Sequence, residues 1–194
     1  MKVIAFNGSP RKNGNTATLI NTVFDELLKE GIETELIQVG GQNIKGCRGC
    51  MKCFEAKDKS CVTSKDDILN ECLQKMIEAD GIIIGSPTYF ANVSSETKAL
   101  IDRAGMVSIA NGHLLKRKVG AAVVAVRRAG ATDVFDAINK FFFINQVIVP
   151  GSTYWNMGFG LDRGTVKNDG EGIGTMKVLG ENMAWLLKKV NTQY

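Results

Sequence analysis

Val3-Ile4-Ala5-Phe6-Asn7-Gly8-Ser9-Pro10-Arg11-Lys12-Asn13-Gly14-Asn15-Thr16 is the stretch that decides the fold. A short apolar run ends in a loop of Gly, Ser, Pro and Asn, and apolar pairs four positions apart follow it. This pattern predicts a strand, a loop and an amphipathic helix. The loop would bring unpaired backbone N–H groups and the positive end of a helix dipole to one point, which favours binding of a phosphate.

Side chains of this loop support the same prediction. Ser9, Asn15 and Thr16 can donate hydrogen bonds, and Arg11 carries a cationic fork. No Asp or Glu occurs before Asp25, so no acidic side chain of this stretch would repel a dianion. These four loop residues are therefore the candidate phosphate-binding residues.

The spacing of the loop excludes several phosphate-binding motifs. A nucleoside-triphosphate loop requires Gly, four residues and then Gly-Lys-Ser/Thr. Here five residues separate Gly8 from Gly14, and Asn15 stands in place of the lysine. The glycines of a dinucleotide fingerprint and the cysteine of a phosphatase loop are also missing. The run Gly-Ser-Pro-Arg-Lys-x-Gly-Asn-Thr resembles the FMN-phosphate loop of the NADPH-dependent FMN reductase superfamily, whose members are flavodoxin-like.

Length and composition predict a single cytoplasmic domain over residues 1–194. This length suffices for one core, and 44% hydrophobic and 23% charged residues are ordinary globular values. The net charge of +4 is mild and the basic residues are dispersed, so nucleic acid is not an expected partner. The apolar start is too short for a signal peptide, and no apolar run approaches the ~20 residues of a membrane span, so no membrane association is expected.

Strand and helix signals alternate along the chain. Strands are expected at 3–6, 33–39, 81–85, 119–126 and 146–150. Helices are expected after the first loop, after a cap at Asp66-Asp67, from about 95 to 105, over 133–145 and over 172–190. These signals predict an α/β fold, a doubly wound five-stranded parallel sheet with helices on both faces. A cysteine-rich insertion is expected at about 44–63, after strand two. The resemblance implies a flavodoxin-like sheet.

A second loop, 86–95, follows the apolar strand at 81–85. Ligands of such sheets bind beyond the carboxyl ends of the strands. The loop offers a rigid proline, an aromatic pair and several hydrogen-bonding groups, which suit a flat conjugated ring; a plain turn with a packed tyrosine is the alternative. Its run Ser-Pro-Thr-Tyr-Phe-x-Asn-Val-Ser resembles the isoalloxazine loop of the same superfamily. The resemblance implies that the flavin-contacting residues are Pro87, Thr88, Tyr89, Phe90, Asn92, Val93 and Ser94.

The third loop, 126–132, departs from the superfamily pattern. Relatives often carry a longer run with paired glycines here, whereas this chain has Arg127 and Arg128. The two arginines are candidate contacts for the flavin or for the phosphates of a nicotinamide dinucleotide, and a solvated pair is the alternative. The glycine-rich loop around residues 155–159, with a Trp, a Met and a Phe, is interpreted as either a flavin cover or an oligomer contact.

The second strong motif is Cys-x2-Cys-x2-Cys-x7-Cys, formed by Cys47, Cys50, Cys53 and Cys61. A reducing cytoplasm disfavours disulfides, so metal or redox chemistry is the better interpretation. Zinc prefers two separated pairs of ligands, whereas three cysteines at three-residue steps plus a distant fourth resemble a [4Fe–4S] arrangement. Here the resemblance narrows to the iron–sulfur flavoproteins. Free or redox-active thiols and a structural zinc are the alternatives.

The remaining titratable side chains offer little acid–base chemistry. Cys72 lies on the apolar face of its expected helix and is interpreted as a buried small hydrophobe. His113 is the only histidine, and its Asn-Gly-His context indicates a surface turn. This composition suits flavin chemistry, in which FMN rather than a catalytic side chain carries the reaction.

Three functions remain open at this point. The first is an FMN oxidoreductase that takes electrons from NAD(P)H or ferredoxin and passes them, with or without a [4Fe–4S] cluster on the way, to a small-molecule or protein acceptor. A flavodoxin-like electron carrier is the second, and a non-redox phosphate-ligand module with a structural zinc is the third. A homodimer or homotetramer is expected. The Phe141-Phe142-Phe143 run and the 155–159 loop offer contact surface, and packing within the subunit is the alternative explanation of both.

Overall fold

A computed structural model describes residues 1–191. The elements along the chain are β1 (Lys2–Asn7), α1 (Asn15–Lys29), β2 (Glu33–Gln38), α2 (Lys52–Ala56), α3 (Leu69–Glu78), β3 (Gly81–Pro87), α4 (Ser95–Ala110), β4 (Val119–Val126), α5 (Ala131–Ile144), β5 (Met157–Phe159), the 3-10 helix η1 (Thr165–Asn168) and α6 (Gly170–Asn191). All strand pairs are parallel, in the order β2-β1-β3-β4-β5. The predicted doubly wound five-stranded parallel sheet is confirmed.

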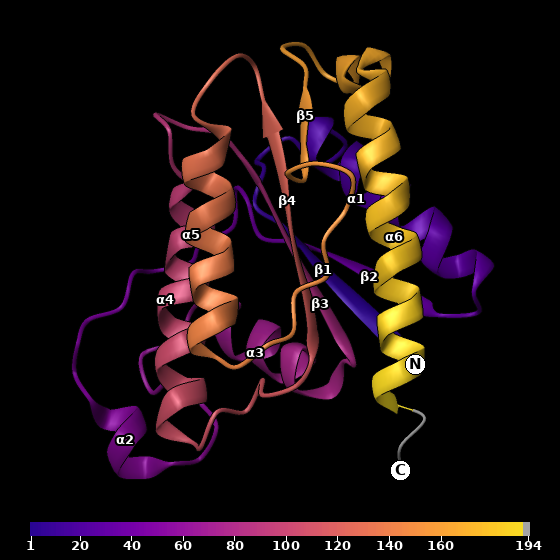
Figure 1. Ribbon diagram of the computed structural model, residues 1–194. Helices are drawn as coiled ribbons and strands as arrows, with labels where there is room; N and C mark the ends of the chain where they lie inside the picture. The colour runs from indigo at the N-terminus through magenta and orange to yellow at the C-terminus, as the bar shows by residue number, and fades with distance from the viewer. Residues whose placement is uncertain (192–194) are drawn as a thin grey trace.

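Helices cover both faces of the sheet (Figure 1). Side chains alternate along β1: Val3 and Ala5 pack with α1 and α6, whereas Ile4 and Phe6 pack with α3, α4 and α5. Because successive strand residues point to opposite faces, both sets must be apolar in a sheet that is covered twice. β3 and β4 are accordingly buried along nearly their whole length. Among residues 1–191, no helix combines the length and apolarity that a membrane crossing needs.

The fifth strand is not where the sequence predicted it. The segment 146–150 forms only an isolated bridge, Val119 to Ile148, whereas β5 is Met157–Phe159 and pairs with the end of β4. The backbone N–H of Ile148 donates to Lys118, and its carbonyl accepts from Gly120. Pro150 has no N–H to continue this pairing, so the chain leaves the sheet and joins it again seven residues later.

Helix boundaries differ from the predictions at several ends. α4 continues to Ala110 rather than ending near Gly105, and α5 and α6 each begin two residues earlier than expected. The expected Asp66-Asp67 cap holds only in part. The N-cap of α3 is Ile68. Asp67 lies one residue before it, and its carboxylate accepts a hydrogen bond of 3.2 Å from the N–H of Leu69. Asp66 is exposed.

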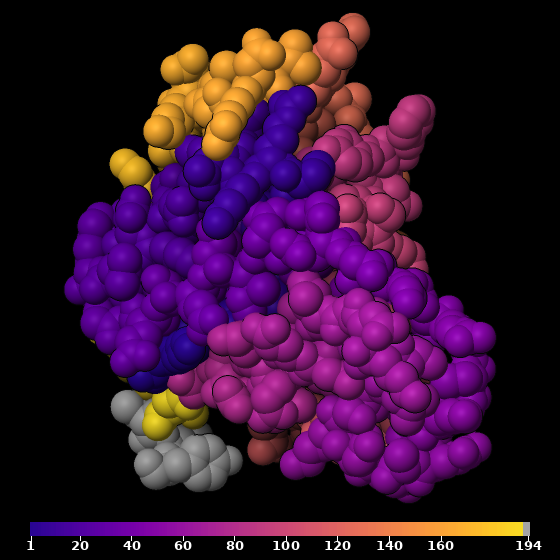
Figure 2. Space-filling view, turned by 180° about the vertical axis from the view of Figure 1, so that it is seen from behind, coloured from indigo at the N-terminus to yellow at the C-terminus, as the bar shows by residue number. Residues whose placement is uncertain are grey.

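The cysteine-rich insertion and the first loop lie at opposite ends of the molecule. Figure 1 places α2 of the insertion at the end of the sheet away from the arrowhead of β4. In the space-filling view, the indigo first loop adjoins the orange segment near residue 160 at the top, whereas the purple insertion protrudes at the lower right (Figure 2). The carboxyl ends of the strands and the insertion therefore present separate surfaces.

Candidate functional site

Three loops at the carboxyl ends of the strands enclose one cavity of about 250 Å³. Eight of the thirteen predicted cofactor contacts line it: Ser9, Arg11, Asn15, Thr16, Pro87, Thr88, Tyr89 and Arg127. The other lining residues are Ala125, Val126, Gly160 and Leu161. The lining holds two arginines and no carboxylate, which favours an anionic ligand.

The first loop, the predicted phosphate-binding loop, lies at the start of α1 and is called the phosphate cradle below. Gly14 is the N-cap and supplies no side-chain cap, and the first turn contains no acidic residue. The N–H groups of this turn lack intrahelical acceptors, so they remain available to an anion. Ser9 is buried, and its Oγ accepts from the N–H of Arg11 at 3.2 Å, which leaves its hydroxyl proton free to donate. Thr16 is also buried, one residue into the helix.

A contact between β1 and α4 fixes the position of this loop. The hydroxyl of Ser94, the N-cap of α4, donates to the carbonyl of Gly8 at 2.7 Å. A Cβ at Gly8 would lie 1.9 Å from Oγ1 of Thr97, so only glycine allows this approach. Ser94 and Val93 are buried and are absent from the described lining of the cavity. Ser94 therefore supports the cradle from behind.

A segment that the sequence analysis did not assign to the site closes the other side of the cradle. Asn15 Nδ2 donates to the carbonyl of Asp162 at 3.0 Å, and Arg163 Nε donates to the carbonyl of Asn13 at 3.1 Å. A Cβ at Gly160 would lie 2.7 Å from both Asn15 Nδ2 and the backbone nitrogen of Val166. The only sequence signal for this contact was the glycine-rich character of the segment.

The second loop has an edge that lines the cavity, formed by Pro87, Thr88 and Tyr89, and an exposed tip. Thr88 Oγ1 is buried and has no hydrogen-bond partner, so a polar edge of a bound ligand would satisfy it. Tyr89 and Asn92 exchange backbone hydrogen bonds across a tight turn. At its tip Phe90 is fully exposed, and Phe90 and Ala91 both have positive φ, 48° and 56°. Phe90 and Asn92 do not contribute to the described cavity lining.

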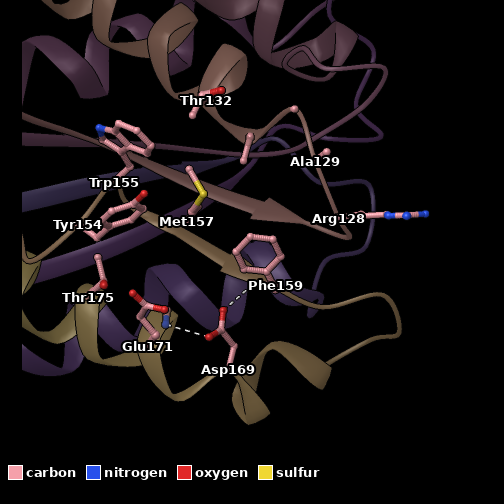
Figure 3. Close-up of a pocket in the computed structure, with 13 residues that line it drawn as sticks. Arg128, Ala129, Thr132, Tyr154, Trp155, Met157, Phe159, Asp169, Glu171 and Thr175 are labelled. Carbon is pink, nitrogen blue, oxygen red and sulfur yellow. Dashed lines mark hydrogen bonds between the residues drawn. The ribbon is translucent and has the colours of Figure 1, made fainter.

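The two arginines of the third loop diverge. Arg127 lines the first cavity, whereas Arg128 lies at a second cavity of about 250 Å³ on the far edge of the sheet. Figure 3 shows the Arg128 side chain pointing away from the aromatic residues of that second cavity. Tyr154 and Trp155 pack against each other there in a tilted arrangement, with ring centroids 4.8 Å apart and ring planes at 52°.

The predicted flavin cover at 155–159 lines this second cavity and does not contribute to the described lining of the first. Met157 is buried, and Trp155 and Phe159 are half exposed. Asp169 holds the edge in place, since its carboxylate accepts from the N–H of Phe159 at 2.7 Å and from that of Gly172 at 3.0 Å (Figure 3).

The four motif cysteines line one pocket between the insertion and α4. All four are free thiols; Cys47 and Cys50 are exposed, whereas Cys53 and Cys61 are partly buried. Burial raises the pKa of the Cys53 thiol. Burial also opposes ionisation of Cys61, but hydrogen bonds from Thr63 and Arg103 outweigh it and lower the pKa of that thiol. The fourth cysteine of the motif is thus the one whose thiolate is favoured.

A fully buried arginine joins the ends of the insertion to α4. Arg103 exposes 1% of its surface, and Nη1 donates to the Asp67 carboxylate and, at 2.9 Å, to the carbonyl of Lys45. Nη2 lies 3.4 Å from both Cys61 Sγ and Thr63 Oγ1. The sequence analysis missed Arg103, because an arginine within a helical pattern gives no signal of burial.

A zinc ion and a [4Fe–4S] cluster require different spacings of the four cysteine sulfurs. A zinc ion bound by four thiolates holds their sulfurs about 3.8 Å apart, given Zn–S bonds of about 2.3 Å. Among residues 1–191, no group of three or more Cys, His, Asp or Glu side chains is gathered for a single ion. In a [4Fe–4S] cluster each cysteine binds a different iron atom, so the sulfurs stand further apart around one pocket. The four cysteines therefore line one pocket of about 20 Å³ without being gathered around a single ion, among the residues that the structure describes.

The remaining cysteine and the histidine lie outside these cavities. Cys72 is buried in the core on α3, as predicted, and burial raises the pKa of its thiol to about 12. His113 follows α4 in a turn with φ of 63°, and neither it nor Cys72 contributes to the described cavity linings.

Comparison with known proteins decides the family. The sequence profile of the NADPH-dependent FMN reductase family matches residues 1–162. The chain belongs to this family. An iron–sulfur flavoprotein of Methanocaldococcus jannaschii is 40% identical over 98% of this chain and 99% of its own, and one of Methanosarcina thermophila is 33% identical over 78% of each chain. This FMN reductase family member is thus similar to iron–sulfur flavoproteins.

Solved structures share the fold of this FMN reductase family member. RosB with a bound riboflavin-5'-phosphate derivative superposes with a TM-score of 0.77 at 21% identity, covering 100% of this chain and 81% of RosB. A WrbA-like flavodoxin from Agrobacterium tumefaciens has a TM-score of 0.66 at 12% identity over 97% of both chains. Family membership makes FMN the expected cofactor, and the cavity fits it, because the cradle lacks carboxylates and Thr88 Oγ1 awaits a partner.

Proposed function

We propose that this protein is an FMN oxidoreductase that takes electrons from NAD(P)H or ferredoxin and delivers them to a small-molecule or protein acceptor. One observation carries the proposal: the phosphate cradle, the Pro87–Tyr89 edge and Arg127 line a single cavity without a carboxylate. Bound FMN would supply hydride and single-electron transfer. The protein would bind and orient the cofactor, and no catalytic side chain is assigned.

Each lining group has a role in this proposal. The hydroxyls of Ser9 and Thr16 and the first N–H groups of α1 would hold the phosphate, with Arg11 as a cationic contact. Residues 162–163 are hydrogen-bonded to the cradle, and in this proposal they would limit the space beyond the phosphate. FMN, which ends in that phosphate, is therefore proposed over FAD.

The flavin ring would lie against the second and third loops. Thr88 Oγ1 would meet a polar ring edge, and Tyr89 would contact the ring. Arg127 is the proposed contact for an incoming nicotinamide dinucleotide, because its guanidinium suits phosphate groups and it lines the same cavity. Arg128 lies at the second cavity and does not contribute to the described lining of the first, so it is the weaker candidate.

The four motif cysteines are proposed to hold a [4Fe–4S] cluster. Their common pocket, the Arg103 and Thr63 contacts to Cys61, and the names of the relatives support this assignment. Such a cluster would supply one-electron transfer. A reducing cytoplasm, the proposed location, would keep the cysteines available as ligands.

Within one subunit, the flavin cavity and the cysteine pocket of this proposal adjoin different parts of α4. Ser94, behind the phosphate cradle, and Arg103, in the cysteine pocket, are separated by about 14 Å of α4. A homodimer or homotetramer in which the insertion of one subunit faces the flavin cavity of another would bring them together. Phe143, exposed on α5, and the half-exposed Trp155 and Phe159 offer apolar contact surface.

The test is a visible spectrum and an iron and sulfide assay on anaerobically purified protein, followed by anaerobic mixing with NADH or NADPH. We expect flavin bands, iron and sulfide, and loss of the flavin absorbance with at least one nicotinamide. Flavin without nicotinamide oxidation would favour the flavodoxin-like carrier, with ferredoxin as donor. Absence of flavin bands after incubation with FMN would refute the proposal.

A further inference from the structure

Arg103 has the largest fully buried side chain among residues 1–191, although it carries a charge. Its side chain is 0% exposed, and the side chain of its partner Asp67 is 1% exposed. Removing such a pair from water costs several kcal/mol per ion, and apolar residues of similar volume often give equal stability. Packing alone therefore does not account for a guanidinium at this position.

The contacts of Arg103 divide into two groups. Nη1 faces Asp67 and the carbonyl of Lys45, which precedes the first cysteine. Nη2 faces Cys61 Sγ and Thr63 Oγ1, each at 3.4 Å. One end of the fork thus holds the two ends of the insertion, and the other end directs N–H groups at the sulfur of the fourth cysteine.

Asp67 is itself held in one orientation. Its carboxylate accepts from the hydroxyl of Ser64 and from the N–H groups of Lys45 and Leu69. The carboxylate therefore balances the charge of Arg103 without competing for Nη2. The Thr63 hydroxyl lies 3.2 Å from Cys61 Sγ, so two hydrogen-bonding side chains converge on this one sulfur.

We propose that Arg103 is a positioning residue for the iron–sulfur cluster, which fixes Cys61 Sγ and raises the reduction potential of the cluster through its N–H donors and positive charge. Hydrogen bonds to the sulfurs and nearby charge are among the factors that set cluster potentials. This inference rests on the proposed function in one respect, that Cys61 ligates a cluster.

The test measures the midpoint potential of the cluster in the holoprotein. In Arg103→Met we expect the ratio of oxidised to reduced cluster at a fixed potential to rise about tenfold, equivalent to 59 mV for one electron. In Asp67→Asn the uncompensated guanidinium should shift the ratio in the opposite direction. Arg103→Lys, which keeps the charge but loses the fork, should fall between Arg103→Met and the wild type.

The controls separate this effect from damage to the fold. Lys177→Met removes the same charge from an exposed position on α6, across the sheet, and should leave the potential unchanged. FMN content should be unchanged in every variant, since Arg103 is absent from the lining of the flavin cavity. Thr63→Val, a milder change, should shift the potential in the same direction as Arg103→Met. An unchanged potential in Arg103→Met, or shifts of the same sign in Arg103→Met and Asp67→Asn, would overturn the proposal.

A second readout needs no cluster. In iron-free protein at pH 7, the thiolate of a cysteine is the species that is alkylated. Relative to exposed Cys47, we expect alkylation of Cys61 to slow about threefold or more in Arg103→Met and to accelerate in Asp67→Asn. Acceleration in both would indicate only a loosened loop and would refute the role of Arg103. A wild-type protein that takes up no iron would refute the cluster assignment. The alkylation rates would still show whether Arg103 favours the thiolate of Cys61.

Discussion

Asn15 Nδ2 donates to the carbonyl of Asp162 at 3.0 Å, joining residues that are 147 positions apart. Asn15 Oδ1 in turn accepts from the N–H of Val166 at 3.4 Å. One amide at the start of α1 thereby ties the phosphate cradle to the segment that follows β5. Segments that are about 150 positions apart in the sequence, around Asn15 and around Leu161, thus line the same cavity.

Ser9→Ala and Thr16→Ala should each weaken FMN binding about 10- to 100-fold, because each removes a hydrogen bond to a charged phosphate worth roughly 1.5–3 kcal/mol. Fluorescence titration of the apoprotein measures the affinity. Riboflavin, which lacks the phosphate, should bind both variants as it binds the wild type. Thr22→Ala is the matched control, since its hydroxyl bonds to Thr18 on the same helix. Equal losses for riboflavin and FMN would contradict the phosphate assignment.

Gly160→Ala should also weaken FMN binding, by about tenfold, because its Cβ would push the closing segment away from Asn15. Gly174→Ala is the control. A Cβ at Gly174, inside α6, meets nothing within 4 Å, so alanine there should stabilise the protein by about 0.5–1 kcal/mol and leave FMN affinity unchanged. Urea unfolding and FMN titration distinguish the two. Unchanged FMN affinity in Gly160→Ala would show that the closing segment is not part of the site.

Arg127→Ala should raise the KM for the reduced nicotinamide about tenfold with little change in flavin content, since one charge-assisted phosphate contact contributes roughly 1.5 kcal/mol. Arg128→Ala removes an equal charge from the neighbouring position and should have a much smaller effect, because Arg128 does not contribute to the described lining of the first cavity. Stopped-flow reduction of the flavin measures both. Equal effects of the two substitutions would indicate general attraction rather than a contact.

Cys72 should make the free energy of unfolding depend on pH above about 8.5. Its folded pKa of about 12 exceeds the value of about 8.5 for an unfolded thiol, so between these values the folded state keeps a proton that the unfolded state has lost. Stability is therefore unaffected by this group below about pH 8.5 and falls by up to about 1.4 kcal/mol per pH unit above it. The difference in urea unfolding between wild type and Cys72→Ala, measured from pH 8 to 11, isolates this contribution.

Hybrid oligomers test electron transfer between the flavin of one subunit and the cluster of another. One parent has all four motif cysteines replaced by serine and keeps its FMN, and the other cannot bind FMN and keeps its cysteines. If electrons pass between subunits, mixing the two parents should restore electron transfer. The expected result is nicotinamide-dependent reduction of the cluster in the hybrid, and in neither parent. Inactive hybrids that retain one intact site of each kind would contradict the shared path, and a monomer by light scattering would exclude it.

The sequence was sufficient where structure follows from local pattern. The first strand, its loop and the start of α1 were predictable because an apolar run, a Gly-rich loop and a helical pattern within sixteen residues leave few alternatives. β5 was misplaced because both 146–150 and 157–159 contain apolar residues, and the choice depends on pairing with β4, which is not a local property. The segment around Leu161 was missed for the same reason.

Arg103 shows a second limit of sequence reasoning. The pattern of α4 indicates a helix, and an arginine on a helix is normally exposed. It is buried here because the insertion, from Lys45 to Asp67, folds over it. The spacing of the four cysteines predicted a metal or redox site, whereas the sequence gives no signal that Arg103 contacts one of them, Cys61.

The bond from the N–H of Phe159 to Asp169 also bears on how copies of this chain can associate. On the outer edge of β5 the N–H of Met157 is likewise occupied, by the carbonyl of Trp155. A strand from a neighbouring molecule would therefore find no free N–H donor at Met157 or Phe159. On the opposite edge of the sheet, β2 presents the charged side chain of Glu35, which pairs with Lys2 and Lys75. Edge-to-edge extension of the sheet is therefore disfavoured, and with it fibrous aggregation. Assembly is left to helices and loops, whose contacts can close into a symmetric particle of fixed size.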